Sequence, residues 1–158
     1  MKFNFFALVL FFAFANNLMA QRQNTLTKFV IQDARINHED VTLTYLKSGG
    51  YIVFYEDENG YLNMANVMSN RNTQSYGRLY SVNHKKIEET STEYEADIFD
   101  FRWSYVNDYD GKEGTAQVRL VKIFKPAGVA FQCTIIPEDL DLIEYKGFME
   151  GSVNFSKY

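Results

Sequence analysis

The stretch ADIFDFRWSYVNDYDGKEGTAQVRLVKIF, residues 96–124, decides the fold of this chain. In its first half the aromatic residues Phe99, Phe101, Trp103 and Tyr105 occupy every second position. Successive side chains of a β-strand point to opposite faces, so this alternation predicts a strand with one buried face. The second half alternates in the same way. The Gly-containing segment 107–114 between the halves therefore predicts a β-hairpin.

Shorter runs with strand character lie on both sides of this hairpin. We expect strands at residues 28–36, 51–55, 61–67, 129–135 and 140–149, and a further pair at 77–82 and 86–93 around a turn at 83–85. Residues 41–47 have the apolar spacing of a short helix that ends before Gly49. Regularly spaced short strands joined by turn residues are typical of sandwiches and barrels. The predicted fold class is all-β, mostly an antiparallel meander that is barrel-like or a sandwich, with one short helix near the mature N-terminus.

The first twenty residues have the order of a secretory signal peptide. Lys2 is followed by an apolar run and a short polar region that ends in Ala20. The apolar run is too short to span a bilayer, and nothing downstream resembles the stop-transfer segment that an uncleaved anchor would require. We expect a signal peptide at 1–20, a single β-rich domain at 21–158, no transmembrane segment in the mature chain, and a secreted or periplasmic location.

Composition excludes some partner classes. The chain has 16 Lys and Arg against 20 Asp and Glu, a formal net charge of −4, without a basic cluster that would bind nucleic acid. Aromatic residues make up 16% of the chain, which is enough to fill a core and argues against disorder. Cys133 is the only cysteine and alternates in step with Phe131 and Ile135, so we expect a buried thiol and no intramolecular disulfide.

Motifs for catalysis, metals and cofactors do not emerge from the sequence. His38 and His84 are the only histidines and neither lies near a second ligand at a recognisable spacing. The acidic turns at 57–60 and 108–111 lack the ligand positions of a calcium loop, and no nucleophile elbow or phosphate-binding glycine loop occurs. We expect no metal, no cofactor and no enzyme activity. A glycan hydrolase that uses only carboxylates remains the alternative.

The order of a strand, a short helix and an antiparallel meander resembles the architecture of the lipocalin and fatty-acid-binding barrels. The lipocalin signature places a Gly two residues before a Trp near the first strand, whereas Trp103 follows Phe101 late in this chain. No motif residue is shared, so we assign the chain to no family. The architectural resemblance implies an interior that carries a small apolar ligand.

These observations predict an exported, non-catalytic module that binds an unknown protein or, alternatively, a small apolar ligand. Aromatic residues on alternate positions can line a cavity instead of a packed core. The candidate ligand-binding residues are Phe99, Phe101, Trp103 and Tyr105. For a protein partner, the polar loop at 69–77 is the candidate surface, with Arg71 and Tyr76 as contact residues.

Overall fold

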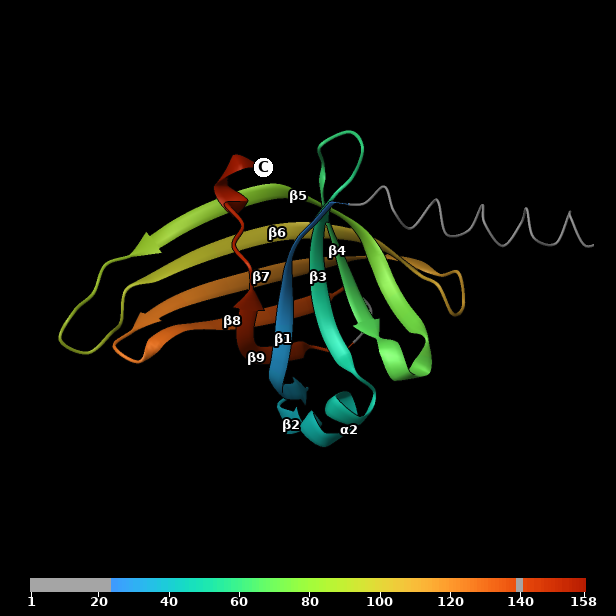
Figure 1. The fold of residues 1–158 in the computed structure, drawn as a ribbon, viewed down its shortest axis with the longest axis horizontal. Coiled ribbons are helices and arrows are strands. Elements are labelled where there is room, and N and C mark those ends of the chain that lie inside the picture. Colours follow the sequence, from blue (N-terminus) through green and yellow to red (C-terminus); the bar gives the residue numbers. More distant parts are fainter. Residues whose placement is uncertain (1–23, 139–140) are drawn as a thin grey trace, which may run out of the picture.

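The computed structural model describes residues 24–138 and 141–158, and the predicted signal peptide at 1–20 lies outside them. Within these ranges eight antiparallel strands form a closed barrel, because β1 pairs with both β3 and β9 (Figure 1). This closure distinguishes the barrel from a sandwich. The strands are β1 (Asn24–Ile36), β3 (Gly50–Glu56), β4 (Leu62–Met68), β5 (Thr73–Ile87), β6 (Ala96–Asn107), β7 (Glu113–Lys125), β8 (Gly128–Pro137) and β9 (Ile143–Glu150).

The hairpin predicted from residues 96–124 is present as β6 and β7. Its register places Trp103 opposite Ala116 and Phe101 opposite Val118, and all four side chains are buried. The outward residues between them are polar. Asp100 accepts two hydrogen bonds from Arg119, at 2.7 Å to Nε and 3.1 Å to Nη2. The period-two pattern therefore predicted both the strands and the buried face.

The expected turn at residues 83–85 is wrong. Strand β5 runs through this segment without a break, and Asn83 lies opposite Asp100 and Lys85 opposite Ile98. The pairing of β5 with β6 slips between Tyr80 and Asn83, where Ser81 has a φ of 55°. Such a bulge bends a strand without ending it, which a strongly curved barrel requires. Residues 83–85 have the polar composition of a turn, but they remain in the strand because their backbone stays paired with β6 after the bulge.

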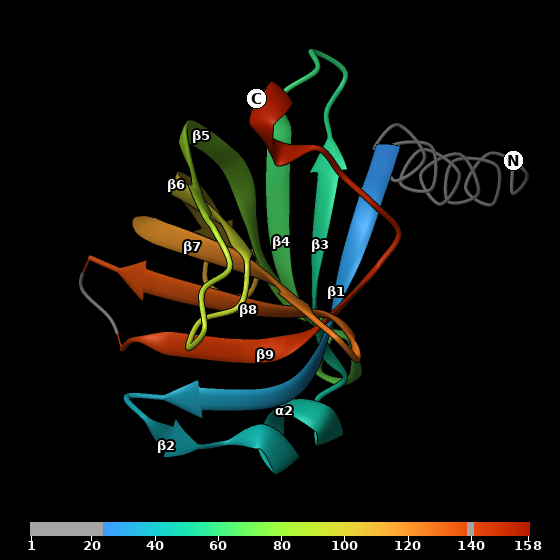
Figure 2. The same cartoon turned by 90° about the vertical axis from the view of Figure 1, so that its left-hand side faces the viewer.

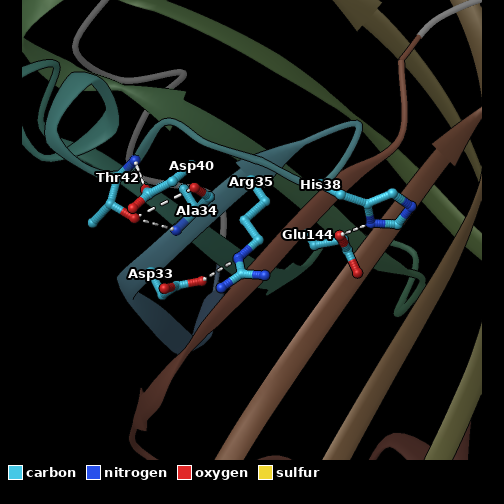
Figure 3. Close-up of polar contacts among 7 residues, drawn as sticks. All are labelled: Asp33, Ala34, Arg35, His38, Asp40, Thr42 and Glu144. Carbon is cyan, nitrogen blue, oxygen red and sulfur yellow. Dashed lines mark hydrogen bonds and ion pairs between the residues drawn. The ribbon is translucent and has the colours of Figure 1, made fainter.

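The predicted helix is present as α2 (Thr42–Lys47) and follows the two-residue strand β2 (Glu39–Asp40). Figure 3 shows how its first turn is tied to the sheet. The Thr42 hydroxyl accepts a hydrogen bond from the backbone N–H of Ala34 at 3.0 Å, and the Asp40 carboxylate accepts one from the N–H of Thr42 at 2.9 Å. The hydrogen bonds from Thr42 lower the pKa of Asp40. These contacts hold α2 against the end of β1.

The other end of the barrel carries the C-terminus. After β9 the chain crosses this end as residues 151–158, which include the short 3₁₀ helix η2 (Phe155–Lys157). Figures 1 and 2 show η2 and α2 at opposite ends of the barrel. A second 3₁₀ helix, η1 (Ser69–Arg71), connects β4 to β5. The barrel therefore has a helix-side end and a C-terminal end.

Candidate functional site

Side chains fill the middle of the barrel. Ten large side chains are less than 2% exposed and come from six of the eight barrel strands: Tyr145, Phe29, Phe54, Ile52, Leu62, Met64, Leu120, Ile135, Val118 and Cys133. The Cys133 thiol is among them, and its burial raises its pKa to about 12, so it is neither ionised nor reactive at neutral pH. Interior space for a ligand therefore lies at the two ends of the barrel.

The cavity at the C-terminal end, here called the C-terminal cavity, has a volume of about 510 Å³. Val129 lines it with 43% of its surface exposed, so the cavity opens to solvent beside an apolar group. Its apolar lining is Phe99, Val129, Phe131, Phe148, Met149, Val153 and Phe155, and its polar lining includes His84, Asp97, Lys122, Asn154 and Ser156.

The C-terminal segment forms one wall of this cavity. Phe155 is only 4% exposed and its ring packs at 5.1 Å from Phe54, 5.4 Å from Phe99 and 5.7 Å from Phe101, measured between centroids. The Asn154 side chain caps η2 by accepting a hydrogen bond from the N–H of Ser156. Phe155 thus anchors residues 151–158 to the core, and Val153 and Tyr158 also pack against it.

His84 joins this segment to the sheet. Its ring stacks on Phe99 at 4.5 Å, its Nε2 lies 2.9 Å from Asp97 Oδ1, and its Nδ1 lies 3.2 Å from Ser156 Oγ. Ser156, His84 and Asp97 are connected here as the residues of a hydrolase triad are. In such triads Nε2 faces the serine and Nδ1 faces the aspartate, whereas here the two nitrogens are exchanged. Ser156 is also exposed. We interpret the contact as a fastening of the C-terminal segment.

The charges in the C-terminal cavity are balanced. Asp97 and Lys122 are direct cross-strand partners on β6 and β7, and both line the cavity. The Lys122 ammonium lies 4.6 Å from the centroid of the Phe124 ring, and within the described residues it forms no ion pair. One anion and one cation beside an apolar wall favour neither sign of ligand charge, so the apolar surface dominates the chemistry of this cavity.

The second interior cavity, here called the helix-side cavity, has a volume of about 210 Å³. It is lined by aromatic, amide, hydroxyl and aliphatic side chains, and no charged residue is among those lining it: Tyr45, Asn66, Met68, Thr73, Gln74, Ser75, Trp103, Tyr105, Asn107, Tyr109, Ile135, Pro137 and Ile143. Helix α2 supplies Tyr45, which is the reason why the anchoring of α2 in Figure 3 matters for this cavity.

A chain of hydrogen bonds runs along one side of the helix-side cavity. Asn66 Nδ2 donates to the Tyr145 hydroxyl at 3.1 Å, and that hydroxyl donates to the Tyr45 hydroxyl at 2.8 Å. Burial raises the pKa of Tyr45 and of Tyr145, so both phenols are neutral at physiological pH. Two buried polar atoms have no hydrogen-bond partner within the described residues: Asn66 Oδ1 and Trp103 Nε1.

The four predicted ligand-binding aromatics all face the interior, but the structure divides them. Phe99 lines the C-terminal cavity, whereas Trp103 and Tyr105 line the helix-side cavity with ring centroids 4.6 Å apart. Phe101 lies between them, 3% exposed, and packs against Phe155. The four residues therefore do not line a single cavity, and the binding role expected for them stays a prediction.

Other lining residues gave no sequence signal. Phe155 stands in a polar tail, and Asn66 is one amide within a strand, so neither has a pattern that marks it. Both enter a cavity only through long-range packing. Hollows of about 530 and 580 Å³ also lie on the barrel surface, lined mainly by polar strand and turn residues, among them Glu113 in one and Arg119 in the other.

The predicted partner contacts lie on the surface. Arg71 ends η1 and is exposed, and Tyr76 on β5 is 39% exposed. Tyr76 is flanked in β5 by Ser75 and Gly77, whose side of the strand faces the interior, so the Tyr76 ring points outward. Both residues are accessible to a partner, and the role expected for them stays a prediction.

Comparison with protein-family models, curated proteins and solved structures finds no match to this chain. In the described ranges, no helix is long and apolar enough to cross a membrane. The same part of the chain contains no group of three or more histidine, cysteine or acidic side chains placed to hold a metal ion. The two interior cavities are therefore the features of the described structure from which function is inferred.

Proposed function

We propose that this protein is an exported, non-catalytic binding protein that holds a small apolar ligand in the C-terminal cavity. The observation that carries the proposal is an interior space of about 510 Å³ that opens to solvent and is walled mainly by apolar side chains. Ligand pockets commonly have volumes of about 300–1,000 Å³ and a mostly apolar lining with a few polar groups. Export rests on the signal-peptide pattern of residues 1–20.

The exposed apolar group at the opening supports this proposal. Val129 presents 43% of its surface to water, which is unfavourable unless something apolar covers it. A ligand in the cavity would remove that surface from water, at about 25 cal/mol for each Å² of apolar area. Association also has an entropic cost, so the apolar contact area determines whether binding is measurable.

Binding of a fluorescent probe tests the proposal. The purified protein is titrated with the neutral apolar dye N-phenyl-1-naphthylamine, and an organic extract of the untreated protein is analysed by mass spectrometry for a co-purified ligand. We expect saturable dye fluorescence. The variant Val129→Asp should weaken dye binding about tenfold or more, because a charged carboxylate at the opening makes the cavity less favourable for an apolar molecule.

Ile136→Asp is the matched control. Ile136 lies on the same strand, is 46% exposed, and belongs to the outward face of β8. This variant should bind the dye as the unchanged protein does. Equal binding by Val129→Asp, or no saturable dye binding together with an extract free of ligand, would contradict the proposal and favour a protein partner at the surface of Arg71 and Tyr76.

A further inference from the structure

We propose that the helix-side cavity is a second binding site, separate from the C-terminal cavity, for a small uncharged ring compound that carries hydroxyl groups, such as a single sugar residue. The packed middle of the barrel lies between the two cavities, and they share no lining residue. At about 210 Å³ the helix-side cavity is smaller than the usual range for drug-sized ligands, which restricts the occupant to a small molecule.

Two of the residues that line this cavity carry a buried polar atom without a partner, which an occupant can satisfy when side chains at the rim move. Asn66 directs its amide N–H toward Tyr145, which leaves Oδ1 as an acceptor without a donor. Trp103 is only 3% exposed, and its Nε1–H is a donor without an acceptor. A buried donor or acceptor that lacks a partner is unfavourable. A hydroxyl group both donates and accepts, so it satisfies either atom.

The absence of charge among the lining residues excludes other ligand classes. An anion or a cation would lose its hydration without meeting an opposite charge, which is strongly unfavourable. A purely apolar molecule would leave Asn66 Oδ1 and Trp103 Nε1 unsatisfied. Tyr45 and Tyr145 are neutral phenols, so the hydrogen-bond chain beside the cavity presents only dipoles. An uncharged polar molecule is the class that remains.

Access requires a movement at the rim. Both unpartnered atoms are fully buried, so a ligand reaches them only when neighbouring side chains turn aside. Tyr109 lines the cavity and is 63% exposed, and Met68 is a half-buried, flexible thioether. The Tyr109 ring also offers an exposed apolar face that can cover one side of a sugar ring.

Trp103 makes binding directly observable, because it is the only tryptophan and lines this cavity. The purified protein is titrated with glucose, galactose, mannose and N-acetylglucosamine while Trp103 fluorescence is recorded. Glucuronate serves as the anionic probe and toluene as the apolar one. We expect a saturable change with at least one of the four neutral sugars, and none with glucuronate or toluene.

Two variants at the site and one outside it complete the test. Asn66→Leu, of similar size, removes the acceptor and should weaken sugar binding about tenfold or more. Should Asn66→Leu fail to fold by circular dichroism, Thr73→Tyr, which fills the rim, should abolish the response instead. Val129→Asp in the other cavity should leave sugar binding unchanged, and N-phenyl-1-naphthylamine should not compete with the sugar.

The outcomes separate this proposal from the apolar-ligand function. No response to any neutral sugar, an equal response to glucuronate, or unaltered binding by a folded Asn66→Leu or Thr73→Tyr variant would overturn the second site while the dye experiment stands. Absence of saturable dye binding by the unchanged protein, together with an extract free of ligand and with saturable sugar binding, would overturn the first function alone.

Discussion

Replacement of Phe155 by alanine tests whether residues 151–158 belong to the folded core. The Phe155 side chain is 96% buried and packs against three other phenylalanine rings, Phe54, Phe99 and Phe101. Truncation of a buried phenylalanine removes its transfer free energy and leaves a cavity, for a typical total of about 3–5 kcal/mol. Because a domain of this size has a free energy of unfolding of about 5–15 kcal/mol, the variant should fold but lose a large part of its stability.

Urea unfolding measures this effect, with far-UV circular dichroism and Trp103 fluorescence as two probes. The difference in midpoint, multiplied by the common slope, gives the change in free energy of unfolding. Trp103 lines the cavity at the opposite end from Phe155, so coincident shifts by both probes would show that the whole barrel is destabilised. A shift of about 3–5 kcal/mol is the expected result.

Tyr94→Ala is the matched control, since Tyr94 is 49% exposed and lies in the loop between β5 and β6. Its truncation should cost under about 1 kcal/mol. If Phe155→Ala also costs under about 1 kcal/mol, the C-terminal segment contributes little to the core. The assignment of residues 151–158 as a wall of the C-terminal cavity would then be incorrect.

Two further predictions concern the barrel wall. Gly147→Ala should destabilise the protein by about 2 kcal/mol or more, because a Cβ at Gly147 would overlap the backbone oxygen of Val30 where β9 meets β1. Urea unfolding measures this loss. Gly111→Ala is the control and should cost less, because Gly111 has open space around it, although its φ is 66°. Stability should also fall with pH above about 8.5, by up to about 1.4 kcal/mol per pH unit, because the unfolded chain releases the Cys133 proton there while burial holds the native pKa at about 12. Urea unfolding across pH 7–10 should show a shallower fall for Cys133→Ala, and an identical pH dependence of the two proteins would refute this assignment.

The alternation of side chains predicted the elements of the barrel. Phe99, Phe101, Trp103 and Tyr105 are all less than 9% exposed, as the period-two pattern predicts for one face of a strand. The short helix at 42–47 was predicted from the spacing of its apolar residues and from the glycine that follows it. Each of these features depends on neighbours within a few residues, which the sequence displays directly.

Local signals failed where distant strands determine the backbone. Residues 83–85 have the composition of a turn, yet they continue β5 because Asn83, His84 and Lys85 pair with β6 after the bulge at Ser81. The free energy of that pairing comes from a partner strand, and a local composition does not reveal it. Closure of the barrel by the pairing of β1 with β9 could likewise not be predicted from local sequence, because the two strands are more than a hundred residues apart.

The sequence by itself determined the buried face of the central hairpin, because burial there follows from the alternation of apolar and polar residues along β6 and β7. Only the tertiary structure decided that the interior is packed in its middle and hollow at both ends, and that Phe155, Tyr45 and Asn66 line the hollows. The physical reason is that a cavity is the space which side chains from many strands leave unfilled. Its position depends on barrel closure and on where α2 and the C-terminal segment pack, which are long-range properties of the chain.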